Sequence, residues 1–96
     1  MTKYEIMFIV KATLDETALN KITKEVQKLI TDNKSKVIEF KDMGRKKLAY
    51  PINKEVSGFY YLMNVEATTE AIQEFDRKLR INENILRHLI LKKESE

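Results

Sequence analysis

Residues 44–52 read Gly44-Arg45-Lys46-Lys47-Leu48-Ala49-Tyr50-Pro51-Ile52. They close a long strand-like segment that begins at Lys36, and a glycine inside such a segment predicts a bulge or bend. Pro51 has no backbone N–H to donate, so we expect this strand to lie at the edge of a sheet. Beyond the bend, Leu48, Tyr50 and Ile52 share one face, which we expect to anchor the strand to the core.

The rest of the chain supplies three more strands and two helices. Residues 4–11 alternate between two sets of side chains, residues 58–67 are rich in aromatics after a polar turn from Asn53 to Ser57, and residues 85–91 are strongly apolar. These patterns predict strands. Amphipathic helical spacing separates them, first as far as Ile30 and again from residue 72 to residue 79.

Local signals mark where the helices begin and end. Thr13 followed by Glu16 is a capping box, which places the first helix start there. Asn33 tolerates the left-handed conformation, so we expect that helix to end near it. Thr68 or Thr69 is expected to cap the second helix.

The order of elements predicts the fold class. The sequence β-α-β-β-α-β is the ferredoxin-like α+β arrangement, a four-stranded antiparallel sheet with two helices on one face. In this topology the second strand lies at an edge, in agreement with Pro51. The opposite sheet face is left open, and we expect four apolar side chains on it to form a protein-partner surface. These are Met7, Ile9, Tyr60 and Leu62.

Composition narrows the class of protein. Ninety-six residues make one domain, 1–96, with residues 92–96 as a short polar tail. The absence of cysteine excludes disulfides and thiolate metal sites. No apolar run approaches the roughly 20 residues that span a membrane, and no signal peptide is visible, so we expect a cytoplasmic protein. The net charge of +3 is a weak preference for polyanions.

Few residues could carry catalysis. His88 is the only histidine and lies in an apolar strand, where a structural role is the better interpretation. No cluster has metal-ligand spacing, and no glycine-rich phosphate loop is present. We therefore expect no enzyme activity, no cofactor and no small-molecule substrate. A small acyl- or phosphoryl-handling enzyme stays as an alternative that would depend on His88.

Basic residues suggest a nucleic-acid partner. Arg45, Lys46 and Lys47 either protect an edge strand from aggregation or contact phosphates. Arg87 stands within an apolar strand and must reach an acceptor. Residues 57–64 partly match the aromatic third strand of RNA recognition motifs, so a free-standing single-stranded RNA module that stacks bases on Tyr60 is an alternative. The parity of Phe59 and Tyr61 favours the helix side for both rings.

The stretch from Gly44 to Ile52 resembles the hallmark segment of the bacterial small-subunit ribosomal protein family six. Further similarity lies in Tyr4-Glu5, in Lys54 and Gly58, and in the closing segment, residues 79–87. The resemblance implies a ferredoxin-like structural component of the small ribosomal subunit that supports assembly and translation. It implies binding to the central domain of the ribosomal RNA together with ribosomal protein eighteen of the small subunit. The implied RNA contacts are Arg45, Lys46, Lys47, Arg80 and Arg87.

Overall fold

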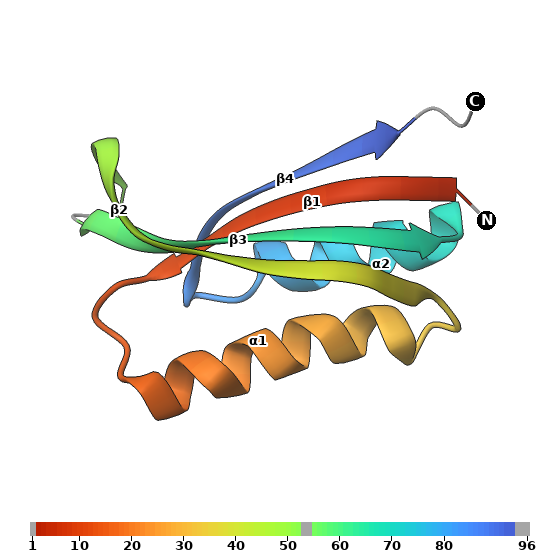
Figure 1. Cartoon of the computed structure of the whole chain (residues 1–96), viewed down its shortest axis with the longest axis horizontal. Helices are drawn as coiled ribbons and strands as arrows, with labels where there is room; N and C mark the ends of the chain where they lie inside the picture. Colours follow the sequence, from red (N-terminus) through yellow and green to blue (C-terminus); the bar gives the residue numbers. More distant parts are fainter. Residues whose placement is uncertain (1, 53–54, 94–96) are drawn as a thin grey trace.

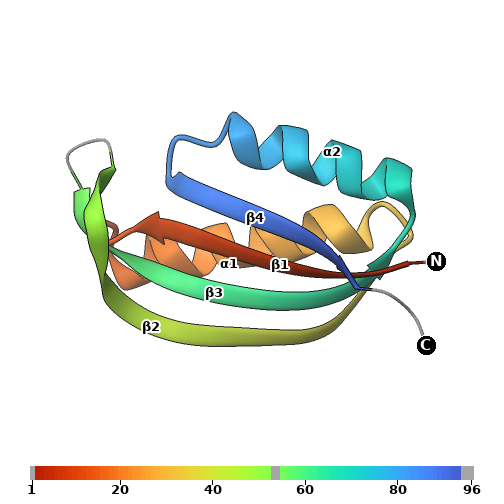
Figure 2. The ribbon, with the colours of Figure 1, turned by 90° about the horizontal axis from the view of Figure 1, so that it is seen from above.

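A four-stranded antiparallel sheet in the order β2-β3-β1-β4 forms one layer, and two helices cover one of its faces (Figures 1 and 2). The computed structural model describes residues 2–52 and 55–93, so Lys54 lies outside the described residues. The elements are β1 (Thr2–Lys11), α1 (Glu16–Thr31), β2 (Lys36–Ile52), β3 (Glu55–Ala67), α2 (Thr69–Arg80) and β4 (Ile85–Lys93). The predicted ferredoxin-like class is confirmed, as is the edge position of β2.

The core lies between the sheet and the helices. Because the side chains of β1 point alternately to the two faces of the sheet, every second one enters this core. The side chains at Tyr4, Ile6, Phe8 and Val10 are buried against both helices. Phe8 stacks on Tyr61 of β3 with ring centroids 5.2 Å apart. The helices contribute Ile22, Val26, Ile30, Ala71, Ile72, Phe75 and Leu79. Tyr61 is buried in this core and Phe59 packs against it, which confirms the predicted orientation of both rings.

The N-cap of α1 differs from the prediction, whereas the helix ends near Asn33 as predicted, with Asp32 as its C-cap. Asp15, rather than Thr13, is the N-cap, and its carboxylate accepts a hydrogen bond from the Ala18 backbone N–H at 2.8 Å. A carboxylate at this position also faces the positive end of the helix dipole. At the other end the left-handed residue is Lys34, with φ 59°, whereas the Asn33 amide donates to the Leu29 carbonyl.

Two strands are longer than predicted. β3 begins at Glu55 and therefore includes residues assigned above to the turn. β4 continues through Lys92 and Lys93, so the predicted tail is wrong for these two residues; residues 94–96 lie outside the described chain. Lys93 pairs with Lys3 of β1, and its Nζ lies 3.4 Å from Glu5 Oε2. The cap of α2 is Thr68, one of the two predicted residues.

The predicted bend in β2 is confirmed at Gly44. This residue has φ 82°, and its N–H donates to the Asp42 carboxylate at 2.8 Å. The register with β3 shifts between Asp42 and Gly44. Beyond the bend, the end of β2 and the start of β3 turn away from the helix side of the sheet (Figure 1). The β2–β3 hairpin is thereby carried toward the open face.

Candidate nucleic-acid interface

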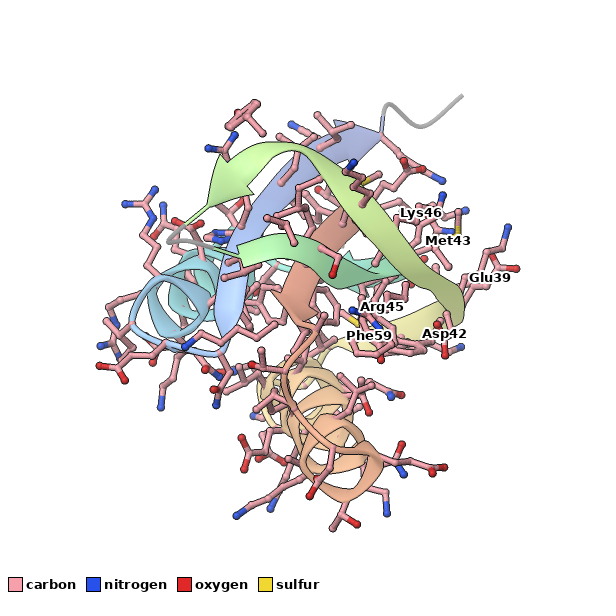
Figure 3. All side chains as sticks on the ribbon, turned by 90° about the vertical axis from the view of Figure 1, so that its left-hand side faces the viewer. Glu39, Asp42, Met43, Arg45, Lys46 and Phe59 are labelled. Carbon is pink, nitrogen blue, oxygen red and sulfur yellow. The ribbon has the colours of Figure 1, made fainter. Side chains whose placement is uncertain are left out.

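Strand alternation divides the basic run in the hairpin between two faces. Arg45 pairs with Phe59 and lies on the helix side, whereas Lys46 pairs with Gly58 and lies on the open side (Figure 3). Lys47 falls on the side of Arg45 by alternation. All three side chains are exposed. The three basic residues are therefore divided between two faces of the hairpin, because successive side chains of a strand point in opposite directions.

Two of the three hairpin cations have a local neighbour that restricts them. Arg45 Nε and Nη2 both donate to the Ser57 hydroxyl, at 3.4 and 3.3 Å. Lys46 Nζ lies over the Tyr60 ring, 5.7 Å from its centroid. Neither contact neutralises the positive charge, so both side chains keep their attraction for an anion.

Arg87 joins Lys46 on the open face. It lies on β4 opposite Ile9 of β1, and its Nη1 donates to the Tyr50 hydroxyl at 2.7 Å. The guanidinium carbon is 5.5 Å from the centroid of the Tyr50 ring. Tyr50 itself is 56% exposed, so the expectation that it anchors β2 to the core is wrong. The bend at Gly44 turns this part of β2 toward β4 instead.

Of the three residues expected to anchor the strand, Leu48 is buried. It lies outside the main core cluster between sheet and helices. The side chain of Ile52 is outside the described part of the structure. Among the described side chains, Leu48 provides an apolar attachment of the hairpin and Tyr50 provides a polar one through Arg87.

Arg80 lies apart from Arg87, on the helix layer. It occupies the last turn of α2, where its Nη2 is 3.0 Å from Asp76 Oδ2. Asp76 Oδ1 also lies 2.6 Å from His88 Nε2. Because His88 pairs with Phe8, it faces the helices, and its side chain is only 14% exposed. This geometry is that of a partnered structural histidine joining β4 to α2.

Among the described residues, His88 belongs to no group that could hold a metal ion. Among residues 2–52 and 55–93, no three or more His, Asp and Glu side chains gather in a way that could hold a metal ion. In the same residues, no helix is long and apolar enough to cross a membrane. The neighbouring Arg77 is exposed and hydrogen-bonds Glu74 at 2.6 Å, which lowers the pKa of the Glu74 carboxyl.

The open face carries an apolar stripe, defined here as Met7, Leu62, Leu89 and Leu91. Met7 pairs with Leu62 on β3 and with Leu89 on β4, and Glu5 pairs with Leu91. Met7, Leu89 and Leu91 are 38%, 52% and 49% exposed.

Two members of the predicted partner surface fit less well. Ile9 is buried, and Tyr60 is only partly exposed with Lys46 over its ring.

The two ends of the open face differ in charge. Away from the hairpin, charged groups pair with each other: Lys93 with Glu5 near the end of the sheet, and Lys41 with Glu39 beside the stripe. At the hairpin end, Lys46 and Arg87 instead face aromatic rings. Since an aromatic ring leaves a cation with its full charge, the hairpin end is the positive end of this face.

A family model described as ribosomal protein S6 matches residues 3–92. The chain belongs to the ribosomal protein S6 family. It is 45% identical over 94 residues to small ribosomal subunit protein bS6 of Shouchella clausii (strain KSM-K16), across 98% of this chain and 99% of that protein. The crystal structure of 30S ribosomal protein S6 from Thermotoga maritima is similar with a TM-score of 0.91 at 27% identity, over 96% of this chain and 87% of that one. The predicted family is confirmed.

Sequence reasoning missed three residues of the candidate interface in this S6-family chain. Leu89 and Leu91 were assigned to a uniformly apolar strand, although they share the parity of Arg87 and therefore its solvent side. The alternation of side chains along this strand could therefore have indicated that both leucines are exposed. Tyr50 was assigned to the core, and its contact with Arg87 spans 37 positions of sequence. No local pattern could have indicated that contact.

Proposed function

We propose that the chain is a structural constituent of the small ribosomal subunit, ribosome-bound in the cytoplasm and without catalytic activity. It binds the central domain of the small-subunit ribosomal RNA together with ribosomal protein eighteen, and so supports subunit assembly and translation. Membership of the S6 family supports the ribosomal context. The matching protein of Shouchella clausii is itself named a small ribosomal subunit protein.

One observation carries the proposal beyond family membership: the uncovered sheet face combines two chemistries. Its middle is the apolar stripe, which would leave about half of three large side chains in water if nothing covered it. Its hairpin end presents Lys46 and Arg87. Exposed apolar surface of this kind marks protein contact, and uncompensated cations beside it suit phosphate.

The five candidate RNA contacts are spread over three surfaces. Arg45 and Lys47 lie on the helix side of the hairpin, Lys46 and Arg87 on the open face, and Arg80 on α2. Each surface alone supplies only one or two phosphate contacts. The isolated chain should therefore bind RNA weakly with a shallow salt dependence. A partner protein that binds the stripe and also touches RNA would raise the affinity through effective concentration.

The alternative of a free-standing module that stacks bases on Tyr60 has no specific observation in its favour. The ring is partly buried in the sheet, and Lys46 lies over it. A base could reach it only after Lys46 moved aside.

The RNA contact is tested by fluorescence anisotropy with a central-domain ribosomal RNA fragment, with and without ribosomal protein eighteen, over a range of salt. The double variant Lys46→Gln/Arg87→Gln should bind more weakly and lower the salt slope by about two. Lys24→Gln removes an exposed charge from α1 and serves as the control. Tight binding by the chain alone, indifferent to the partner, would contradict the proposal, as would no binding in the presence of the partner.

The protein contact is tested on the apolar stripe. Leu89→Gln/Leu91→Gln should reduce affinity for ribosomal protein eighteen by about tenfold or more, because two half-exposed leucines lose apolar burial in the complex. Ile81→Gln changes an even more exposed apolar residue at the end of α2 and should leave the affinity unchanged. Equal effects of the two substitutions would show that the stripe is not the docking surface.

A further inference from the structure

Tyr50 is an exposed aromatic side chain held in place by a cation. Its hydroxyl accepts the 2.7 Å hydrogen bond from Arg87, and the same guanidinium lies against the ring. The residue is still 56% exposed. The bond joins the hairpin to β4, so the ring is fixed in orientation before any ligand arrives. A ring that is fixed in orientation while more than half of the residue stays exposed is unusual for a residue whose only role is packing.

The surroundings of the ring fit a nucleotide. Lys46 pairs with Gly58 and points to the open face, the face on which Tyr50 contacts Arg87. Among side chains that the structure describes, neither Lys46 nor Arg87 has a carboxylate partner. Proteins that bind single-stranded RNA combine such cations, which attract the backbone, with aromatic rings on which bases stack. An arginine guanidinium can assist base stacking by lying against the face of the ring opposite the base.

We propose that Tyr50 stacks against an unpaired base of RNA while Arg87 orients the ring and, with Lys46, attracts the adjacent phosphates. This inference rests on the proposed RNA-binding function and assigns it a base contact. The stacking residue is then Tyr50 of the hairpin, and Tyr60 within the sheet is not required. Since every base has a stacking face, the contact selects unpaired RNA over duplex rather than one base over another.

The experiment uses the full chain and a single-stranded 12-nucleotide oligouridylate with one central 2-aminopurine. Anisotropy of a terminal dye reports binding, and quenching of 2-aminopurine reports stacking. The wild-type chain should bind at low salt and quench the base. Tyr50→Leu should abolish most of the quenching and weaken binding about 5- to 150-fold per stacked base. It should leave the salt slope unchanged, because no charge is removed.

Two control variants separate the ring from its surroundings. Tyr50→Phe keeps the ring without the hydroxyl and should retain the quenching. Tyr60→Leu removes the other ring that faces a cation and should also retain it. Urea unfolding of each variant checks that the fold is intact, which we expect for Tyr50→Leu because the side chain is exposed.

Several outcomes would overturn the stacking role. Binding without quenching, or equal quenching by the Tyr50→Leu variant, would leave the RNA-binding function standing and remove the base contact. If Tyr50→Phe behaves like Tyr50→Leu, the hydroxyl bond matters and the ring does not. If Tyr50→Leu weakens only the complex with ribosomal protein eighteen, the ring belongs to the protein interface. No binding of the 12-mer at all would also overturn it, and the ribosomal RNA fragment tests the broader function separately.

Discussion

Gly58 offers a test of how closely β3 packs on β1, because its substitution has a predictable sign. An alanine Cβ at this position would lie 2.5 Å from Ile9 Cγ2 and 3.1 Å from the Val10 carbonyl oxygen. Gly58 does not have a positive φ. The backbone alone would therefore favour alanine by about 0.4–1 kcal/mol through the unfolded state. We expect the steric contact to reverse this preference.

The size of the effect follows from the displacement that the new methyl group requires. Ordinary van der Waals contact begins near 3.4 Å, so Ile9 Cγ2 would have to move by about 0.9 Å. Ile9 is buried and β-branched, which restricts its choice of rotamer. The Val10 oxygen belongs to the backbone, which the hydrogen bonds of the sheet hold in place. Overpacking of this kind costs about 1–3 kcal/mol. For a domain of this size, this loss lowers the Tm by about 4–8 °C per kcal/mol.

Urea unfolding followed by circular dichroism measures the change, and a double-mutant cycle with Ile9→Ala assigns its cause. Shortening Ile9 removes Cγ2, so Gly58→Ala should cost at least about 1 kcal/mol less in that background. Gly44→Ala is a useful contrast, because it meets no atom within 4 Å and is strained only by its φ of 82°. It should show no coupling to Ile9. A stabilised Gly58→Ala variant, or an uncoupled one, would refute the reasoning.

Three further predictions concern the stability of the fold. Asp15→Ala should lower the free energy of unfolding by about 1 kcal/mol through loss of the α1 cap, while Thr13→Ala should change it by less than about 0.5 kcal/mol. Asp76→Ala leaves His88 without its partner and should cost about 1–3 kcal/mol in urea unfolding. Burial, with Asp42 nearby, raises the pKa of Tyr61 to about 12 from 10.0. The unfolded chain therefore loses this proton first, and stability should fall between about pH 10 and 12 by up to about 3 kcal/mol, a loss that Tyr61→Phe should lack.

Much of the fold was predictable because its signals are local. Alternation in residues 4–11 located β1 and its buried face, and Thr68 marked the start of α2. The predicted end of α1 near Asn33 was correct, but the predicted N-cap was wrong because Thr13 and Asp15 both have side chains suited to capping. The sequence contains no record of which one the chain uses. Helix boundaries depend on the path of the loop, which adjacent residues do not fix.

The candidate interface was predictable in its residue types and poorly predictable in its geometry. The basic run in the hairpin and Arg87 were identified from sequence. Their distribution over two faces follows from strand alternation combined with the bulge at Gly44. A single unpaired residue at a bulge moves every later side chain of the strand to the other face of the sheet, so its position decides which face each one occupies.

By itself, the sequence determined the family, the order of elements, the edge position of β2 and the bend at Gly44. Each of these depends on residue identity, on short-range periodicity or on the missing N–H of Pro51. Only the tertiary structure decided where residues 44–52 point. Their turn toward the open face brings Tyr50 to Arg87 across 37 positions and exposes a ring that local pattern assigned to the core. Contacts between distant segments depend on the summed twist and bulges of the whole sheet, which no local pattern encodes.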